Sequence, residues 1–438
     1  MHAISSRDPA RLTTLSPETV RPYLVNLARA LNGVLAPELA GPARARAIDC
    51  LRIIVRIATE LASTRDALPS PDTSPNSALA EAKLRQALEL EAAQLMSEVR
   101  SKPAPVERAL DGAAVQAFLR RHSQGGEKVR ITDSRLLGGG RSKLTALLVL
   151  DGARDLPGEL VIRQDWSASV VGSSVAAEFE LLRRLQREGL EVPRPVLCNG
   201  SMGEFGRPFI LVERSRGSSS GDNQHVLPLS REPVWQLAAQ LGRLHSLDVA
   251  MFADLPTVEE RHYSRAQLLS SLAGFAQVIH ASEGSRSALV DAVISHLHDN
   301  VDRATQGPRA LVHGDLGFHN ILCQDDELVS ILDWELSHIG SPAYDLGYLR
   351  NALANEDMWS EFVARYRAAG GPVVDRYRVD YYHLFTCVWF YHIAIKVRQA
   401  IEQGILGDLE MVVVCADILP RNLAAMGRTY ATLSESQR

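Results

Sequence analysis

The chain of 438 residues is long enough for two or three domains, and its 46% apolar and 23% charged residues are ordinary for a globular protein. Its 47 basic and 52 acidic side chains give a formal net charge of -5, which argues against nucleic acid and membrane surfaces as partners. No stretch approaches the roughly 18 apolar residues of a membrane span, and the first residues lack the order of a signal peptide. The five cysteines lie far apart without a Cys-x-x-Cys pair, which predicts a reducing, cytoplasmic location rather than a disulfide framework or a zinc site.

The first hundred residues are expected to be helical. Apolar side chains recur at helical spacing over about 20–31 and 43–63, and a stretch rich in Ala, Leu and Glu covers about 78–100. The Pro-rich segment 101–105 is expected to be a linker. No cluster of chemically active side chains occurs in this region, so the sequence predicts a helical N-terminal module and linker over residues 1–104.

Beyond the linker the pattern changes from helix to strand. Helices are expected over 112–122 and near 174–188. Short apolar or alternating stretches indicate strands at 129–137, 144–150, 160–163 and 209–212. The rest of the chain is mostly helical in pattern, apart from short apolar strands around 321–333. A sheet followed by a helical body predicts an α+β fold.

Two short segments, 311–320 and 331–335, contain acidic and amide side chains in a distinctive order. Phosphoryl transfer from ATP requires a carboxylate that orients the acceptor hydroxyl, and oxygen ligands that hold Mg²⁺ against the phosphates. Asp315, Asn320 and Asp333 supply these groups, and Asn320 follows Asp315 by five positions, as in the protein-kinase catalytic loop. Any one of these acids alone would more commonly be a helix cap or a turn residue, but that interpretation does not explain the ordered triple.

The motif His-Gly-Asp-x-x-x-x-Asn followed by Asp-Trp-Glu resembles the aminoglycoside phosphotransferase and choline kinase family. It is nearest to the branch of kinase domains fused to acyl-CoA dehydrogenases, and the resemblance covers roughly residues 109–400. The resemblance implies a protein-kinase-like fold of two lobes behind the N-terminal all-helical extension. It places the small lobe and hinge at 105–217 and the large, mostly helical lobe at 218–438.

The resemblance also implies a role for each motif residue. Asp315 matches the catalytic Asp, Asn320 and Asp333 match the metal ligands, and Asp345 matches the acid that braces the catalytic loop. Family members often have Gly-Asp-Pro shortly before that last acid, whereas this chain has Gly-Ser-Pro at 340–342. This difference from the family pattern affects the loop before Asp345 and leaves the expected metal ligands unchanged.

A glycine cluster lies between two of the expected strands. Gly138, Gly139, Gly140 and Ser142 would let the backbone approach phosphates closely and turn N–H groups toward them. The segment fits neither the P-loop pattern nor a dinucleotide fingerprint. Alone it would be an ordinary hairpin turn, but upstream of the other motifs it resembles the nucleotide-covering loop of the family.

Two further small-lobe features complete the expected nucleotide site. Arg163 ends its strand where kinases place a phosphate-pairing Lys, and Glu178 lies on the next helix where the pairing Glu belongs. A surface salt bridge is the alternative interpretation of this pair. Glu213 and Ser215 follow an apolar strand and match the hinge between the lobes, whose backbone would bind adenine.

Several histidines and aromatic residues are expected to be structural. His313 should support the catalytic loop by hydrogen bonds, and His245 should brace it from the first large-lobe helix. His319 and His338 are expected at the surface or in loops rather than as metal ligands. The aromatic run at 381–391 has helical spacing and is expected to be mostly core, with one face available to line an acceptor pocket.

The sequence and the resemblance together predict an ATP- and Mg²⁺-dependent phosphotransferase that phosphorylates a hydroxyl of a small molecule. The alternative is a pseudokinase or nucleotide-dependent binding module, with the N-terminal helices as its partner surface. A protein kinase is disfavoured because no Ala-Pro-Glu segment follows Asp333. From Ser341 to the C-terminus 11 acids nearly balance 10 bases, which favours a neutral or anionic acceptor such as a hydroxy acid or its thioester over a polycation.

Overall fold

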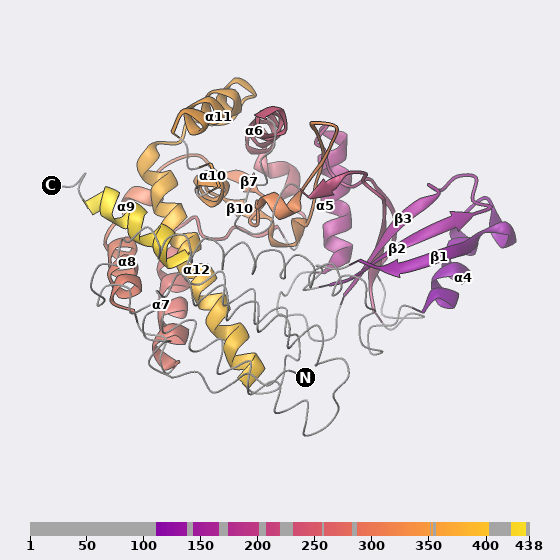
Figure 1. Cartoon of the computed structure of the whole chain (residues 1–438), viewed down its shortest axis with the longest axis horizontal. Helices are drawn as coiled ribbons and strands as arrows, with labels where there is room; N and C mark the ends of the chain where they lie inside the picture. Colours follow the sequence, from indigo (N-terminus) through magenta and orange to yellow (C-terminus); the bar gives the residue numbers. More distant parts are fainter. Residues whose placement is uncertain are drawn as a thin grey trace, which may run out of the picture. The chain divides into compact units, whose positions relative to one another are not determined.

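The computed structural model describes the chain from residue 111 to residue 434, with gaps, as a mixed structure of helices and sheets (Figure 1). The described residues are 111–137, 143–165, 174–200, 207–219, 231–255, 258–282, 287–350, 352–353, 356–402 and 422–434. The expected N-terminal helical module and linker therefore lie outside the described residues. The larger of two compact units comprises Pro103–Gly274, Ala292–Thr386 and Thr429–Arg438, and it holds all the motif residues.

The small lobe is a five-stranded antiparallel sheet with two helices. Its strands follow the order β1-β2-β3-β5-β4. Their bounds are Arg130–Leu136 for β1, Lys143–Asp151 for β2, Glu159–Asp165 for β3, Pro195–Asn199 for β4 and Phe209–Glu213 for β5. Helix α4 (Gly112–His122) precedes the sheet, a 3-10 turn (Gly126–Lys128) leads into it, and α5 (Val175–Arg187) connects β3 to β4.

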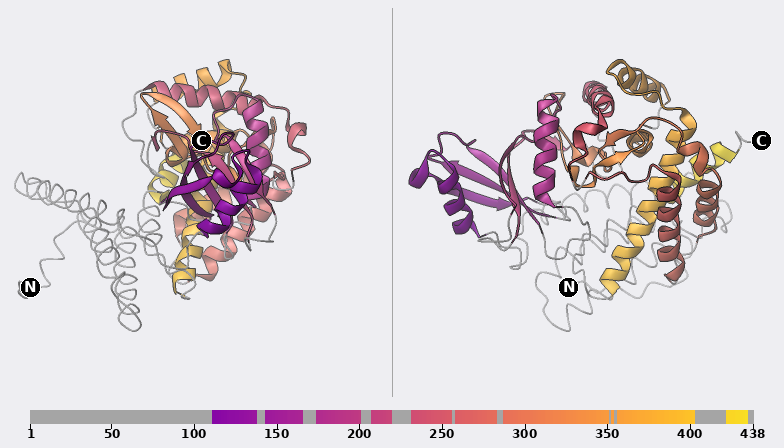
Figure 2. Two further views of the ribbon diagram at one scale, coloured as in Figure 1. Left: turned by 90° about the vertical axis from the view of Figure 1, so that its right-hand side faces the viewer. Right: turned by 180° about the vertical axis from the view of Figure 1, so that it is seen from behind.

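Both faces of this sheet are covered, which explains the uninterrupted apolar run of β5. Side chains alternate between faces along a strand. Phe209 and Leu211 pack in one core cluster with α4, whereas Ile210 and Val212 belong to the cluster that includes α5. The second view of Figure 2 shows α4 and α5 beside this sheet. The central strand β3 is thereby fixed in register, with Arg163 opposite Thr145 of β2 and Ile210 of β5.

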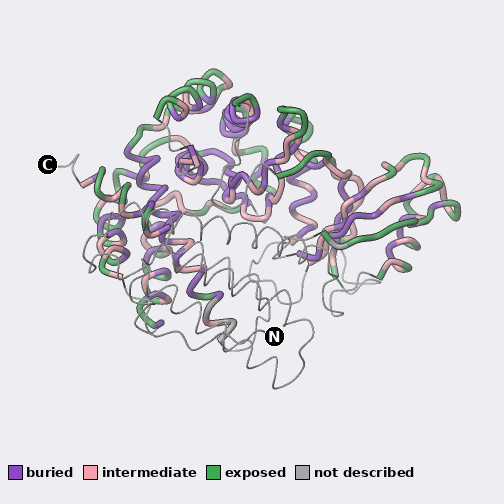
Figure 3. The backbone as a smooth tube through the Cα atoms, viewed as in Figure 1, coloured by how far each residue is buried: buried purple, intermediate pink, exposed green. Residues whose placement is uncertain are grey.

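The large lobe is mostly helical. Its helices are α6 (Arg231–Ser246), α7 (Arg265–Ala281), α8 (Ala288–Asp299), α9 (Val301–Ala304), α10 (Ala343–Arg350), α11 (Glu356–Ala368) and α12 (Arg376–Glu402). The burial map in Figure 3 shows α6 and α10 as largely buried, in agreement with their side-chain exposures. No helix among the described residues is long and apolar enough to cross a membrane.

Short strands and 3-10 turns lie within this helical body. The strands are β6 (Ser218–Ser219), β7 (Ala310–Val312), β8 (Ile321–Gln324), β9 (Glu327–Ile331) and β10 (His338–Gly340). β8 and β9 form a hairpin with β6 at its edge, and β7 pairs with β10. The 3-10 turns are η6 (Val249–Phe252), η7 (Phe318–Asn320) and η8 (Trp334–Leu336).

The expected elements after residue 111 agree with the structure to within a few residues, and the α+β prediction is confirmed. The expectation for His338 is wrong, because this residue lies in β10 with 3% of its surface exposed. A parallel bridge between Ile339 and Glu260 encloses the strand on its other side. Three-residue strands such as β7 and β10 are too short to show an alternating pattern, which is why the sequence did not indicate them.

Candidate active site

The β8–β9 hairpin brings the two expected metal ligands together. Ile321 pairs with Ile331 in the hairpin register, and at the next position the Leu332 amide donates to the Asn320 carbonyl at 2.7 Å. Asn320 therefore immediately precedes one strand, and Asp333 follows the other by two residues. Asp333 adopts a left-handed backbone conformation with φ 64°, which Asp and Asn tolerate better than most residues and which is frequent at functional sites.

Asp345 of α10 holds the backbone of the catalytic loop. Its carboxylate accepts the amides of His313 at 2.8 Å and Gly314 at 3.0 Å, and the ring of His245 lies 3.1 Å away. Burial alone would raise the pKa of Asp345, but the hydrogen bond and charge of His245 hold it below its ordinary value. The bracing role expected for Asp345 and His245 agrees with these contacts.

Only glycine fits at position 314 of the loop. Its φ is +84°, and a Cβ atom there would lie 2.3 Å from the carbonyl oxygen of Leu336. His313 supports the same turn with both ring nitrogens. Nε2 lies 2.8 Å from the Leu332 carbonyl and must donate to it, so Nδ1 accepts the amide of Asp315 at 3.2 Å. The supporting role predicted for His313 is thereby confirmed.

The Asp315 carboxylate is surrounded by donors. Tyr348 donates to Oδ1 at 2.5 Å, Asn320 Nδ2 donates to Oδ2 at 3.2 Å, and His319 Nε2 lies 3.6 Å from Oδ2. Burial would raise the pKa of Asp315, but His319 and Tyr348 together lower it to about 2. Asp315 is therefore a carboxylate at neutral pH, suited to accept a hydrogen bond from a hydroxyl group.

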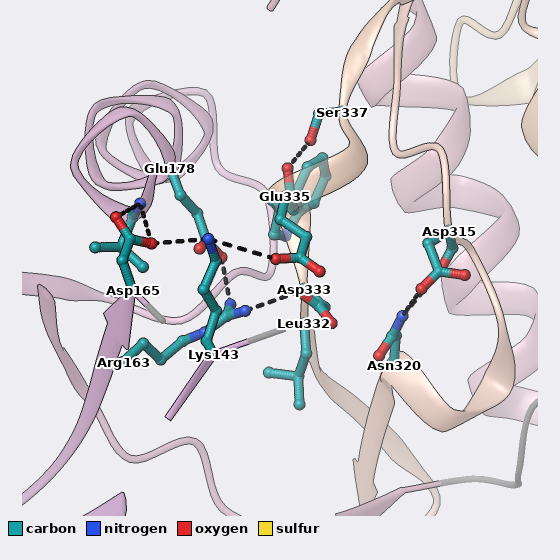
Figure 4. A network of polar contacts seen from close by, with 12 residues as sticks. Lys143, Arg163, Asp165, Glu178, Asp315, Asn320, Leu332, Asp333, Glu335 and Ser337 are labelled. Carbon is teal, nitrogen blue, oxygen red and sulfur yellow. Dashed lines mark hydrogen bonds and ion pairs between the residues drawn. The ribbon is translucent and has the colours of Figure 1, made fainter. Parts of the chain in front are cut away.

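The side chain of Asn320 is held in one orientation by Asp315. Its amide nitrogen donates both to the backbone carbonyl of Asp315 at 2.9 Å and to the Asp315 carboxylate (Figure 4). Because the nitrogen is fixed in this way, the amide oxygen turns away from Asp315. An amide oxygen and a carboxylate are oxygen donors that hard cations prefer, so Asn320 and Asp333 are the side chains that would hold Mg²⁺.

Arg163 links the small lobe to the large lobe. Its Nη1 donates to Glu178 of α5, and its Nη2 donates to Asp333 at 2.8 Å (Figure 4). Although burial lowers the pKa of a guanidinium, the charges of Glu178 and Asp333 raise that of Arg163 overall, so it is a permanent cation. The geometry supports the predicted Arg163–Glu178 pair over the surface salt bridge, since the side chains are only 15% and 3% exposed.

A second cation, Lys143, was not singled out by sequence reasoning. It begins β2 opposite Asp165 of β3, and its side chain is 1% exposed. Its Nζ lies 2.7 Å from Asp165 and 3.9 Å from Glu335, the acid of the Asp-Trp-Glu motif (Figure 4). A Lys three positions after a glycine cluster, at the start of a strand, was the available signal. A lysine buried to this degree requires such anionic partners.

The other predicted site residues lie apart from this centre or outside the described part of the chain. Glu213 ends β5, and its carboxylate pairs with Arg194 rather than pointing into the Asp315 network. Ser215 follows in the segment between β5 and β6. Gly138, Gly139, Gly140 and Ser142 lie outside the described residues. His319 lies on η7 with its side chain 24% exposed, next to Asp315.

The aromatic run of α12 is mainly core, as predicted. Tyr381, Tyr382 and Phe385 have no exposed surface. The Tyr381 hydroxyl donates to the Leu297 carbonyl at 2.9 Å, which satisfies its buried polar atom. These residues are thereby accounted for by packing.

The fold and the site define a phosphotransferase of the kinase type. The model of the "Phosphotransferase enzyme family" matches residues 133–382, more than half of the chain, and the protein belongs to this family. The expected resemblance to the branch fused to acyl-CoA dehydrogenases is also confirmed. Acyl-CoA dehydrogenase family member 10 of Mus musculus is 28% identical over 198 residues, which cover 43% of this chain and 18% of that protein. The chain spans about a fifth of the length of the curated relatives that it matches.

Solved structures show the same two-lobed fold. A protein of Ralstonia eutropha assigned as an aminoglycoside phosphotransferase has a TM-score of 0.56 at 17% identity, and the match covers 73% of this chain and 99% of that one. Aminoglycoside 2'-phosphotransferase-IIIa in complex with GDP has a TM-score of 0.52 at 18% identity, covering 72% and 99%. The predicted kinase-like fold is thereby confirmed.

Proposed function

We propose that this kinase transfers the γ-phosphoryl group of ATP, with Mg²⁺, to a hydroxyl of a small molecule. One observation carries the proposal: Asn320 donates a hydrogen bond to the Asp315 carboxylate, and the backbone bond from Leu332 to Asn320 brings the next residue, Asp333, close to this pair. The same three residue types perform orientation and metal binding in known kinases. A pseudokinase or binding module would not require this set to remain together.

The residues of the chain take distinct parts in the proposed reaction. Asp315 accepts the hydrogen bond of the acceptor hydroxyl and directs its oxygen toward the phosphorus atom. Asn320 and Asp333 would hold Mg²⁺, which when bound neutralises phosphate charge and orients the leaving group. Because the transition state of phosphoryl transfer is loose, positioning by Asp315 contributes more than its weak basicity.

Arg163 and the hinge would complete the nucleotide site. The Arg163 guanidinium, which Glu178 holds through Nη1, would turn its Nη2 from Asp333 to a phosphate oxygen when metal and nucleotide bind. The backbone at Glu213 and Ser215 would bind the base, and the glycine loop 138–142 would cover the phosphates. We also propose that the small lobe and hinge span residues 105–217 and that the large lobe spans residues 218–438.

We propose a hydroxy acid or its thioester as the acceptor. Relatives named as acyl-CoA dehydrogenase family members support an acyl thioester, because those names denote proteins that act on such compounds. The near balance of acids and bases after Ser341 supports a neutral or anionic molecule. The cysteines are widely spaced in the sequence, and the proposed reaction uses ATP. Both features are consistent with a cytoplasmic location.

A turnover screen tests the proposal. Purified full-length protein with Mg²⁺ and either ATP or GTP is incubated with hydroxy acids, their CoA thioesters, amino alcohols and sugars, and phosphorylated products are measured by mass spectrometry. We expect ATP-dependent phosphorylation in the hydroxy-acid or thioester group, abolished by EDTA. Nucleotide binding without phosphorylation of any compound would favour the pseudokinase alternative.

A further inference from the structure

Tyr348 contacts the proposed catalytic carboxylate directly, although it belongs to none of the motifs. Its phenol donates to Asp315 Oδ1 at 2.5 Å, whereas Asn320 and His319 face Oδ2. The two oxygens of the carboxylate are thus engaged from different sides. A carboxylate held on both oxygens cannot rotate freely about its Cβ–Cγ bond.

Gly317 gives the His319 ring room beside the loop, and the Tyr348 ring packs next to it. A Cβ atom at position 317 would lie 2.4 Å from Cε1 and Nδ1 of His319, whereas Cε1 of Tyr348 would be in ordinary van der Waals contact at 3.4 Å. The amide of Gly317 donates to the Asp315 carbonyl at 2.9 Å, so this packing occurs within the catalytic loop itself. The absence of a side chain at position 317 therefore lets the His319 ring lie against the loop.

Helix α10 places Tyr348 on the same face as the bracing acid. Asp345 and Tyr348 are three residues apart, and residues at this spacing are neighbours on a helix surface. Asp345 holds the loop backbone at His313 and Gly314, and Tyr348 holds the side chain of the next residue. One helix thus controls both the path of the loop and the direction of its carboxylate.

The helix that carries Tyr348 is itself tightly fixed. A Cβ atom at Gly347 would lie 2.6 Å from the His383 amide nitrogen and 2.9 Å from the Val379 carbonyl oxygen, so α10 packs directly on the backbone of α12. His383 Nδ1 lies 3.0 Å from the Gly347 carbonyl. The phenol of Tyr348 therefore projects from a support that cannot shift independently.

We propose that Tyr348 is a positioning residue for phosphoryl transfer: its hydroxyl fixes the Asp315 carboxylate in the direction that receives the acceptor hydroxyl. The inference rests on the proposed function, in which Asp315 orients the acceptor. Small misplacements of a positioning group cost large factors in rate, since the reacting atoms must be aligned. Tyr348 acts through Asp315 and leaves the metal ligands untouched.

The variant Tyr348→Phe removes one hydroxyl and retains the ring. We expect kcat to fall by about tenfold or more at saturating Mg-ATP, with the KM for Mg-ATP changed less than about twofold. Tyr381→Phe is the matched control, because its hydroxyl also donates a hydrogen bond, to the Leu297 carbonyl away from the catalytic loop. This control should retain the wild-type kcat.

A double-mutant cycle separates this inference from the proposed function. Asp315→Asn should lower turnover by roughly 10² or more, and adding Tyr348→Phe to it should then have little further effect. Rates are measured with the best acceptor of the screen or with water, whichever is faster. Wild-type kcat in Tyr348→Phe, or an equal fall in both backgrounds, would overturn the role of Tyr348. Full activity of Asp315→Asn would instead overturn the assignment of Asp315.

A structural measurement tests the same inference without turnover. Crystal structures of the wild type and of Tyr348→Phe are compared at the Asp315 side chain. We expect one carboxylate orientation in the wild type and a rotated or second orientation in the variant. An identical single orientation in both structures would contradict the proposal.

Discussion

Asp333 has a left-handed backbone conformation, and its carboxylate contacts Arg163. Asn also tolerates the left-handed region, so Asp333→Asn changes the charge with little backbone strain. We expect the variant to lose most of the stabilisation that Mg-ATP gives the wild type, because a hard cation loses an anionic ligand. Thermal shift with ATP, with and without Mg²⁺, measures this difference. An undiminished Mg²⁺-dependent shift in the variant would reject Asp333 as a metal ligand.

Arg163 uses the two ends of its planar guanidinium for two different acids. Nη1 binds Glu178 and Nη2 binds Asp333, an arrangement that the single ammonium of Lys cannot reproduce. We therefore expect Arg163→Lys to lower kcat/KM for Mg-ATP by about tenfold, although the charge is kept. Arg183→Lys is a suitable control, since Arg183 makes an exposed pair with Glu180 on α5. Equal kcat/KM in wild type and Arg163→Lys would mean that simultaneous binding of two acids by the guanidinium is dispensable.

Residue types and spacing were sufficient to propose Asp315, Asn320 and Asp333, because the five positions from Asp315 to Asn320 and the later Asp match the pattern of a kinase catalytic loop. The same approach did not find Tyr348 or Lys143. Tyr348 lies 33 positions from Asp315 in the sequence, and a Tyr in a helix is ordinarily a core residue. The importance of Lys143 follows from its contacts with Asp165 and Glu335, and these residues come near it only in the folded protein.

Two histidines in and beside β10, the buried His338 and the partly buried His262, make the stability of this region dependent on pH. His262 stacks on Tyr344, His338 meets the same ring edge-on, and the two imidazole centroids are 5.5 Å apart. Burial lowers the pKa of His262 to about 3 and that of His338 to about 4. In an unfolded chain a histidine has a pKa of about 6.5. The unfolded state therefore binds more protons between about pH 6.5 and 4.

The sign of the effect follows from this difference in bound protons. Stability is fully present above about pH 6.5 and is lost as the pH falls toward 4, by up to about 1.4 kcal/mol per pH unit for each group. We expect the free energy of unfolding, measured by urea denaturation, to be lower at pH 5 than at pH 7. His338→Asn keeps a donor for the Leu336 carbonyl and should show a smaller loss. Equal stability of the wild type at both pH values would contradict the lowered pKa values of His262 and His338.

The helices and strands were predictable from the sequence where their patterns of apolar residues were long. The strands β2, β3 and β5 carry apolar stretches of several residues, and α4 and α5 have capping residues, Asp111 and Ser174, that accept backbone amides. β7 and β10 have three residues each and obtain their hydrogen bonds from partners 26 or more positions away. His338 was misplaced for this reason, since its burial depends on that distant pairing.

At the scale of the molecule, the charges of the large lobe bear on the choice of acceptor. Aminoglycosides are polycations, and a site for them should present several free carboxylates together. In the described part of the chain after Asp333, most carboxylates are already engaged by arginine. The pairs are Glu356 with Arg350 and Arg376, Glu361 with Arg365, Asp375 with Arg378, and Asp380 with Arg376.

These ion pairs lead to a prediction about substrate choice. Because Glu356, Glu361, Asp375 and Asp380 are paired with arginines within the protein, they would have to exchange an intramolecular partner for the ammonium groups of a substrate, which yields little net attraction. We expect no efficient phosphorylation of kanamycin-like compounds, even though the fold is shared with aminoglycoside phosphotransferases. Steady-state assays with Mg-ATP and kanamycin measure this, with the best hydroxy acid or thioester of the screen as the positive control. A kcat/KM for kanamycin above about 10⁴ M⁻¹s⁻¹, the low end for natural substrates, would show that the pocket concentrates negative charge despite these pairs.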